Sequence, residues 1–219
     1  MVQLLLAGIY GGGEVDFVSS TRGRILELQQ ADGSWKPGGQ LLSMNRSAVE
    51  ATRVTTTWAA LALSDDADAP SKEGVARARA FLQNAPPSKV LEALAARLLF
   101  DKKFGEDAFP ATLQDLLGRQ NPDGGWASLQ GAASDAFATG QVLYALSATA
   151  ATAADGAIRR GRRFLTETQE QDGSWPLPPL ALTSPKRTPE RLKNVEPIYR
   201  YWGSAWAAIG LAATLPSKS

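Results

Sequence analysis

The sequence contains no cysteine and no histidine among its 219 residues. Disulfide bonds are therefore excluded, and so are catalytic mechanisms that depend on a cysteine or a histidine. Zinc sites built from thiolate or imidazole ligands are excluded for the same reason. Any proton transfer has to use Asp, Glu, Lys, Arg, Tyr or water. We expect neither a bound metal ion nor an organic cofactor.

A strong charge and long apolar runs are also lacking. The net charge of +1 gives no reason to expect a nucleic-acid partner. No apolar run approaches the roughly 20 residues of a transmembrane helix, and residues 1–8 lack the basic start and the length of a secretory signal. The compartment is not indicated. The length and the hydrophobic content of 44% predict one globular domain over residues 1–219.

What the sequence does contain is one motif in three copies, Gln-x-x-Asp-Gly-x-Trp. The copies comprise Gln29, Asp32 and Trp35; Gln120, Asp123 and Trp126; and Gln169, Asp172 and Trp175. Asp-Gly suits a tight turn, the Gln amide can bond free backbone groups at a neighbouring helix end, and Trp can bury a large face. We therefore interpret this Gln-Trp motif as a structural mark of a repeat architecture.

Each copy follows an amphipathic stretch and precedes an apolar, Ala-rich one. The amphipathic stretches are residues 21–29, 110–120 and 158–169, and the apolar ones lie near residues 50–64, 89–101, 136–148 and 202–214. The first two copies are separated by nearly twice the distance between the last two, so we place a degenerate copy at residues 77–98. There, prolines at residues 86–87 replace the Asp-Gly turn. The alternation predicts an all-α fold with an outer and an inner layer of helices.

The Gln-Trp motif and its helical context resemble the squalene–hopene cyclase and prenyltransferase superfamily over nearly the whole chain. Residues 134–146 and 172–206 are most similar to bacterial squalene-cyclase-like domains. The resemblance implies an α/α toroid with a ligand cavity on its axis. The chain has room for about four helical hairpins, fewer than a complete toroid, so we expect a fragment or a minimal arc. Residues 1–8 resemble the end of a further inner helix. A homodimer would bury the apolar surface that an open arc exposes.

The family's chemistry is only partly matched. The resemblance implies alkene protonation by the middle Asp of an Asp-x-Asp-Asp motif, which this sequence lacks. Its nearest string runs from Asp65 to Asp68 and has the wrong order, which favours a solvated loop over a divalent-ion site. Protein prenyltransferases hold zinc with Asp, Cys and His, and thioester domains on a similar toroid need Cys, so neither branch fits.

Three carboxylates remain as candidates for chemistry. Asp135 stands just before an inner helix, where it is either a helix N-cap or an acid or ligand-binding carboxylate at the mouth of the cavity. Glu50 and Glu196 stand near the starts of two other inner helices, and Glu50 can also pair with Arg53 across one turn. If the chain is an enzyme, which the sequence does not decide, we expect Asp135 to be its acid.

Aromatic residues on or beside the inner helices are candidates for lining an apolar cavity, with packing as the alternative. They are Trp58, Phe137, Tyr144, Tyr201, Trp202 and Trp206. Residues 176–200 form the longest insertion between repeats, and we expect an irregular loop there, either a lid or a proline-rich connector.

Three functions are consistent with these features. The leading hypothesis is an isoprenoid-handling domain that binds or transforms an apolar ligand, by squalene-cyclase-like isomerase or lyase chemistry if it reacts. One alternative is a non-catalytic protein-interaction module on the same toroid. The other is a carboxylate-based hydrolase or carbohydrate-acting enzyme, which requires acids that converge in one groove. Fold alone does not choose among them.

Overall fold

The computed structural model describes residues 14–38, 47–84, 88, 90–176 and 189–215. Within these residues the secondary structure is α-helical, apart from one short 3-10 helix and a single antiparallel bridge between Val90 and Leu129. The all-α class predicted from the sequence is confirmed. Residues 1–8 and 85–87, on which the sequence analysis commented, lie outside the described residues.

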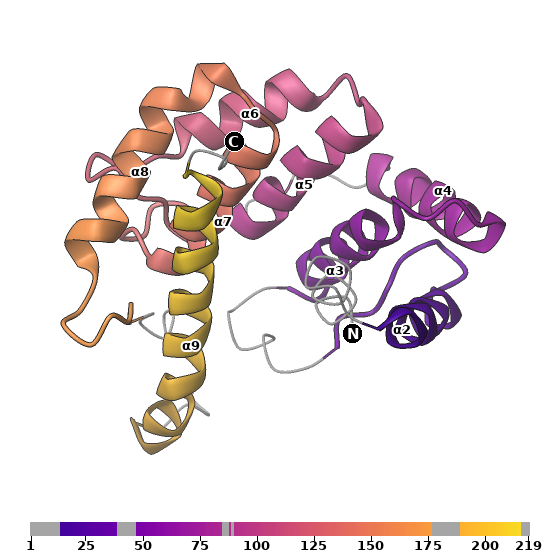
Figure 1. The fold of residues 1–219 in the computed structure, drawn as a ribbon, viewed down its shortest axis with the longest axis horizontal. Helices are drawn as coiled ribbons and strands as arrows, with labels where there is room; N and C mark the ends of the chain where they lie inside the picture. Colours follow the sequence, from indigo (N-terminus) through magenta and orange to yellow (C-terminus); the bar gives the residue numbers. More distant parts are fainter. Residues whose placement is uncertain (1–13, 39–46, 85–87, 89, 177–188, 216–219) are drawn as a thin grey trace. The chain divides into compact units, whose positions relative to one another are not determined.

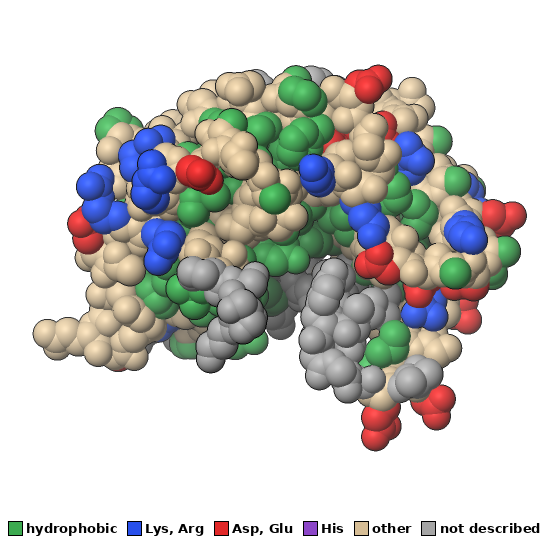
Figure 2. Space-filling view, turned by 45° about the horizontal axis from the view of Figure 1, so that its top comes forward, with side chains coloured by type: hydrophobic (Ala, Val, Ile, Leu, Met, Phe, Trp, Pro, Cys, Tyr) green, Lys and Arg blue, Asp and Glu red, His purple; other side chains and the backbone are tan. Residues whose placement is uncertain are grey.

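The chain divides into two compact units, Met1–Ser88 and Lys89–Ser219, where the sequence analysis expected a single domain. The division falls at the degenerate copy of the repeat, which has no glutamine at the motif position and no tryptophan. In Figure 1 the first unit is coloured indigo to purple and the second magenta to yellow. Charged side chains of both signs are distributed over the surface drawn in Figure 2, in keeping with the net charge of +1.

Unit 1 contains the helices α2 (Val15–Glu27), α3 (Ala48–Leu63) and α4 (Ala69–Gln83). Two of them begin at N-caps: the Ser47 hydroxyl accepts a hydrogen bond from the Glu50 N–H at the start of α3, and the Asp68 carboxylate accepts one from the Ser71 N–H at the start of α4. Helix α4 packs on both α2 and α3. The apolar face of α3 is buried, with Ala59 and Ala60 fully inaccessible.

Unit 2 is built around α7 (Ala136–Ala148), nearly all of whose residues are buried. Its other helices are α5 (Leu91–Phe104), α6 (Phe109–Gly118), the 3-10 helix η2 (Thr152–Ala154), α8 (Asp155–Thr168) and α9 (Pro189–Ala213). Helix α7 packs on α5, α8 and α9, as Figure 1 shows. Helix α8 keeps one buried face and exposes its arginines. An apolar helix beside an amphipathic one is the pairing that the sequence predicted.

Helices α7 and α9 approach so closely that only glycine fits between them. A Cβ at Gly140 would lie 2.1 Å from the carbonyl oxygen of Trp206, and one at Gly210 would lie 2.5 Å from the carbonyl oxygen of Gly140. The two backbones are therefore in direct contact, and a side chain at either glycine would separate the two helices.

Residues 176–200 are not an irregular loop throughout, contrary to the sequence-based prediction. Helix α9 begins at Pro189, and Pro197 lies inside it. Proline at the first position of a helix needs no N–H partner, so Pro189 starts α9 rather than excluding it. Residues 177–188 lie outside the described residues.

Candidate functional site

The three Asp-Gly turns share one hydrogen-bonding pattern. In each copy the Asp carboxylate accepts a hydrogen bond from the backbone N–H two residues on, at 2.9 Å. In the first copy the Ser34 hydroxyl also donates to Asp32, and in the third the Ser174 hydroxyl donates to Asp172, which lowers the pKa of both carboxyls. The glycine that follows each Asp has φ between +82° and +89°, which favours glycine on steric grounds.

Each motif tryptophan is anchored at both of its N–H groups. The indole Nε1 donates to a backbone carbonyl ten residues earlier, that of Ile25, Leu116 or Leu165. The backbone N–H of Trp126 donates to the Thr139 hydroxyl at 2.9 Å. Thr56 accepts from Trp35 in the same way, and Ser204 from Trp175. These hydroxyls lie on α3, α7 and α9 and complete the motif, although they were not among the residues predicted from the sequence.

In two of the copies, the motif glutamine joins its own turn to the helix that packs on it, which is α4 in unit 1 and α8 in unit 2. The Gln120 amide nitrogen donates to the carbonyls of Gly124 and Ala157, at 2.8 and 2.9 Å, while its oxygen accepts from the Arg160 guanidinium. In unit 1 the Gln29 amide nitrogen likewise donates to the carbonyls of Gly33 and Gly74, and its oxygen accepts from the Arg77 guanidinium. The partner carbonyls lie within α4 and α8, not at helix ends as the sequence analysis expected.

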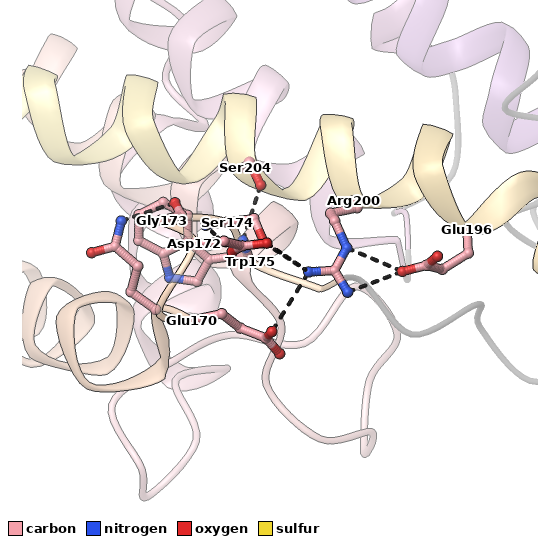
Figure 3. Close-up of polar contacts among 9 residues, drawn as sticks. Glu170, Asp172, Gly173, Ser174, Trp175, Glu196, Arg200 and Ser204 are labelled. Carbon is pink, nitrogen blue, oxygen red and sulfur yellow. Dashed lines mark hydrogen bonds and ion pairs between the residues drawn. The ribbon is translucent and has the colours of Figure 1, made fainter.

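The third copy is built differently around its glutamine. The Gln169 amide nitrogen donates to Gly173 at 2.9 Å, and no described residue bonds its oxygen. Arg200 of α9 lies over the turn instead: it donates to the Ser174 hydroxyl at 2.7 Å and lies 3.6 Å from the Glu170 carboxylate. Figure 3 shows this guanidinium between the turn and Glu196. Arg200 thus contacts the acidic residues of the turn and makes no hydrogen bond with Gln169, which is exposed.

Asp135 is the N-cap of α7. One carboxylate oxygen accepts from the Ala138 N–H at 2.7 Å, and the other accepts from the Ser128 N–H at 2.8 Å. The side chain is buried, and burial raises the pKa of this carboxyl while the two N–H bonds oppose the rise. The cap and the bond from the Ser128 N–H account for both oxygens, so the role of Asp135 as an acid stays a prediction.

The other two candidate acids are each held by a local partner. Glu50 accepts a hydrogen bond from Arg53 one turn later, at 3.4 Å, as the sequence predicted, and another from the Ser88 hydroxyl. Glu196 is exposed and accepts from Arg200 at 3.0 Å. Among the described residues of unit 2, these contacts do not bring a second carboxylate to Asp135. A hydrolase site with two converging acids would require such a second carboxylate.

The acidic string between α3 and α4 is also engaged locally. Asp68 caps α4, and Asp66 pairs with Arg22 of α2. Burial raises the pKa of Asp66, and the pairing with Arg22 opposes that rise. These contacts make the string part of the packing of unit 1.

The candidate aromatic residues fall into three groups. Phe137 and Tyr144 of α7 both meet Trp206 of α9 edge-to-face, with ring centroids 6.4 and 6.1 Å apart. Tyr201 and Trp202 contact each other at 5.7 Å, and Tyr201 is 66% exposed. Trp58 belongs to α3 in the other unit. Only the first group forms a cluster, and we call Phe137, Tyr144 and Trp206 the aromatic cluster.

Gln141 lies on the same face of α7 as the aromatic cluster, four residues after Phe137 and three before Tyr144. Its side chain is 3% exposed, and neither its amide oxygen nor its nitrogen has a hydrogen-bond partner among the described residues. A buried amide without partners costs about 1–3 kcal/mol and calls for an explanation. Gln141 was not among the residues predicted from the sequence, where the signal for it is a lone amide in the apolar segment 136–148.

The chain matches no protein-family model and no curated protein. Within the described residues, no helix is both long enough and apolar enough to cross a membrane. The function is therefore argued from the site alone.

Proposed function

We propose that this chain is a helical-repeat domain related to the squalene–hopene cyclases and prenyltransferases, with their α/α-toroid arrangement, and that it binds an apolar isoprenoid-like ligand beside the aromatic cluster. The relationship is supported by the Gln-Trp motif, since its three copies share one turn and one tryptophan anchor. The ligand site is supported by the position of Gln141.

The unpartnered amide of Gln141 is the observation that carries the proposal. Two donors and one acceptor are buried next to three aromatic rings that meet edge-to-face. Ligand sites are mostly apolar and contain a few polar groups that fix orientation. An isoprenoid alcohol has matching parts: its chain contacts the rings, and its hydroxyl exchanges hydrogen bonds with the amide.

The proposal is for binding and not for a specified reaction. Cyclisation by protonation needs an acid directed into a dry cavity, and both oxygens of Asp135 already accept backbone hydrogen bonds. The hydrolase alternative needs two converging acids, whereas Glu196 is paired with Arg200. The interaction-module alternative is favoured by a separate observation, the exposed glutamine of the third copy.

Native mass spectrometry of the purified chain, with extraction of lipids that co-purify, tests the proposal. Farnesol is the defined probe, and hexadecanol is the comparison of similar apolar character without the branched unsaturated chain. We expect farnesol to bind, and we expect Gln141→Leu and Trp206→Ala to weaken it by about tenfold or more, because each removes a contact to the ligand. Gln114→Leu, on the exposed face of α6, is the matched control.

Two results would count against the site. If Gln141→Leu raises the stability of unit 2 and leaves farnesol binding unchanged, the amide is an internal packing defect. If neither a co-purified lipid nor farnesol binds up to its solubility limit, the aromatic cluster is packing only.

A further inference from the structure

The third copy of the Gln-Trp motif presents the surface that in the other two copies is covered by a helix. Gly33 and Gly124 are buried, and a Cβ on either would lie 2.4 or 2.8 Å from the carbonyl oxygen of the covering helix, at Arg77 or Arg160. Gly173 and Gln169 are exposed, and the nearest described atom to a Cβ on Gly173 is the Gln169 amide nitrogen at 3.8 Å. We call Gln169 and Gly173 the third-motif face.

The turn beneath this face is already formed. Gln169 donates to the Gly173 carbonyl at 2.9 Å, compared with 3.0 and 2.8 Å for the equivalent bonds of Gln29 and Gln120. Trp175 is only 5% exposed, and its indole is anchored on the Leu165 carbonyl. Binding here would therefore require little ordering of the chain, which favours affinity.

The two helices that cover a Gln-Trp motif share a sequence pattern. Residues 74–82 read Gly-Val-Ala-Arg-Ala-Arg-Ala-Phe-Leu, and residues 157–165 read Ala-Ile-Arg-Arg-Gly-Arg-Arg-Phe-Leu. Both have a small residue, an arginine three positions later, another small residue and then Phe-Leu. We call this the covering pattern.

Three positions of the covering pattern have a contact that explains them. In α8 the first small residue, Ala157, supplies the carbonyl for the Gln120 amide, and Arg160 donates to the amide oxygen. The second small residue, Gly161, lies against the Trp126 indole, where a Cβ would be 2.8 Å from a ring carbon. A helix that docks on a Gln-Trp motif therefore needs these small residues and this arginine at the same spacing.

The helices α2 and α6 give an internal comparison. Aligned through their tryptophan-anchoring carbonyls, they have Ser20 and Ala111 at the position of the covering arginine. For α6 this agrees with the degenerate copy before it, where Pro86 stands in place of the motif glutamine that would receive an arginine. The arginine is present in the two helices that follow a motif glutamine and absent from α6, which follows a copy without one.

We propose that the third-motif face binds an α-helix of a second protein that carries the covering pattern. The docked arginine would donate to the Gln169 oxygen, which no described residue bonds, and the amide nitrogen would donate to a carbonyl of that helix. A second copy of this chain is a poor occupant, because the sequence holds the full pattern only at residues 74–82 and 157–165, and there Arg77 and Arg160 already bind Gln29 and Gln120.

A peptide with the sequence of residues 68–84, stabilised as a helix by a side-chain crosslink, is the probe, since isolated helices of this length are marginal in water. Its binding to the full chain is measured by fluorescence anisotropy, and the contact is located by NMR on the Gln169 side-chain amide and the Gly173 N–H. We expect saturable binding that shifts these signals and leaves those of Gln29 and Gln120 in place.

Three variants make the test specific. Gln169→Ala in the chain and Arg77→Ala in the peptide are each expected to weaken binding by about tenfold, because each removes hydrogen bonds to a charged group. Gln171→Ala, at an exposed variable position of the same motif, is expected to change nothing. Circular dichroism confirms that the chain variants remain folded, and the peptide variant tests the same bonds without altering the chain.

Either of two outcomes would overturn the proposal. Equal affinity for the parent peptide and its Arg77→Ala variant would mean that the contact is non-specific. A chain that sediments as a dimer, and becomes monomeric with Gln169→Ala, would show that a second copy occupies the face instead of another protein.

Discussion

The Arg160 guanidinium donates from α8 to the amide oxygen of Gln120, in the turn that follows α6. The same glutamine donates to carbonyls of its own turn and of α8. One side chain thus joins the turn after α6 to α8 through all of its polar atoms, and Gln29 joins the turn after α2 to α4 in the same way. The glutamine is consequently a connector between successive repeats.

Removing the connector should uncouple α8 from the preceding turn. We expect Gln120→Ala to lower the free energy of unfolding of unit 2 by about 1–3 kcal/mol, because it removes one side chain with several hydrogen bonds. A double-mutant cycle with Arg160→Ala should give a coupling energy of about 1 kcal/mol. Urea unfolding, with each unit's transition fitted separately, is the measurement. Arg159→Ala on the exposed face of α8 is the control, and a coupling energy near zero would contradict the interpretation.

Glycine substitutions should separate the turn from the docked helix. Gly124 and Gly173 have φ of +89° and +82°, so alanine at either position is strained by about 1–2 kcal/mol. Only at Gly124 would the new Cβ also meet the docked helix, 2.8 Å from the Arg160 carbonyl oxygen. We expect Gly124→Ala to cost about 1–3 kcal/mol more than Gly173→Ala, from overpacking. Equal losses in thermal or urea unfolding would mean that α8 does not rest on this turn.

The Thr139 hydroxyl on α7 accepts a hydrogen bond from the Trp126 N–H. We expect Thr139 to stabilise unit 2 through this hydrogen bond more than through the volume of its side chain. Thr139→Val keeps the volume but leaves a buried N–H without an acceptor, which costs about 1–3 kcal/mol. Thr139→Ser keeps the hydroxyl, as Ser204 does in the third copy, and loses about 0.8 kcal/mol for one methyl group. If valine proves the more stable variant in urea unfolding, packing outweighs this bond.

The helices and the turns were predictable because their signals are local. The Asp-Gly pairs predict turns and the apolar periodicity predicts helices, and each signal spans only a few residues. The helices expected near residues 50–64, 89–101 and 136–148 are α3, α5 and α7. The hydroxyl partners of the tryptophans were not predictable, because they follow at 21, 13 and 29 residues and so form no fixed spacing. Contacts across variable loops are visible only once the helices are packed.

The third copy shows a stricter limit of sequence reasoning. Gln169 and Gln120 stand in the same motif and bond the same carbonyl of their own turn, yet one is exposed and the other is half-buried. The difference lies in what packs on each turn and not in the turn itself. Asp135 was likewise ambiguous, because a cap and an acid place the same residue type before a helix, and only the hydrogen bonds from Ala138 and Ser128 account for its two oxygens.

Asp135 should have a marked effect on the stability of unit 2. Asp135→Ala removes the cap of α7, at about 1 kcal/mol, and leaves the buried Ser128 N–H without an acceptor, at about 1–3 kcal/mol. Asp68→Ala, which removes an exposed cap from α4, is the matched control and should cost about 1 kcal/mol in unit 1. Losses of equal size would mean that the second bond of Asp135 contributes little.

The pH dependence of unit 2 should carry the sign of a buried carboxyl. Burial raises the pKa of Asp135 above its ordinary value of 3.8, so the folded state binds a proton more readily than the unfolded state does. The stability that this group contributes is fully present below pH 3.8 and is lost as the pH rises through the raised pKa. Asp135→Asn has no such titration, so the stability difference between wild type and variant should shift toward the variant as the pH rises through this window. Urea unfolding from about pH 4 to pH 8 measures it, and a shift toward wild type would mean that the N–H bonds to Asp135 outweigh its burial.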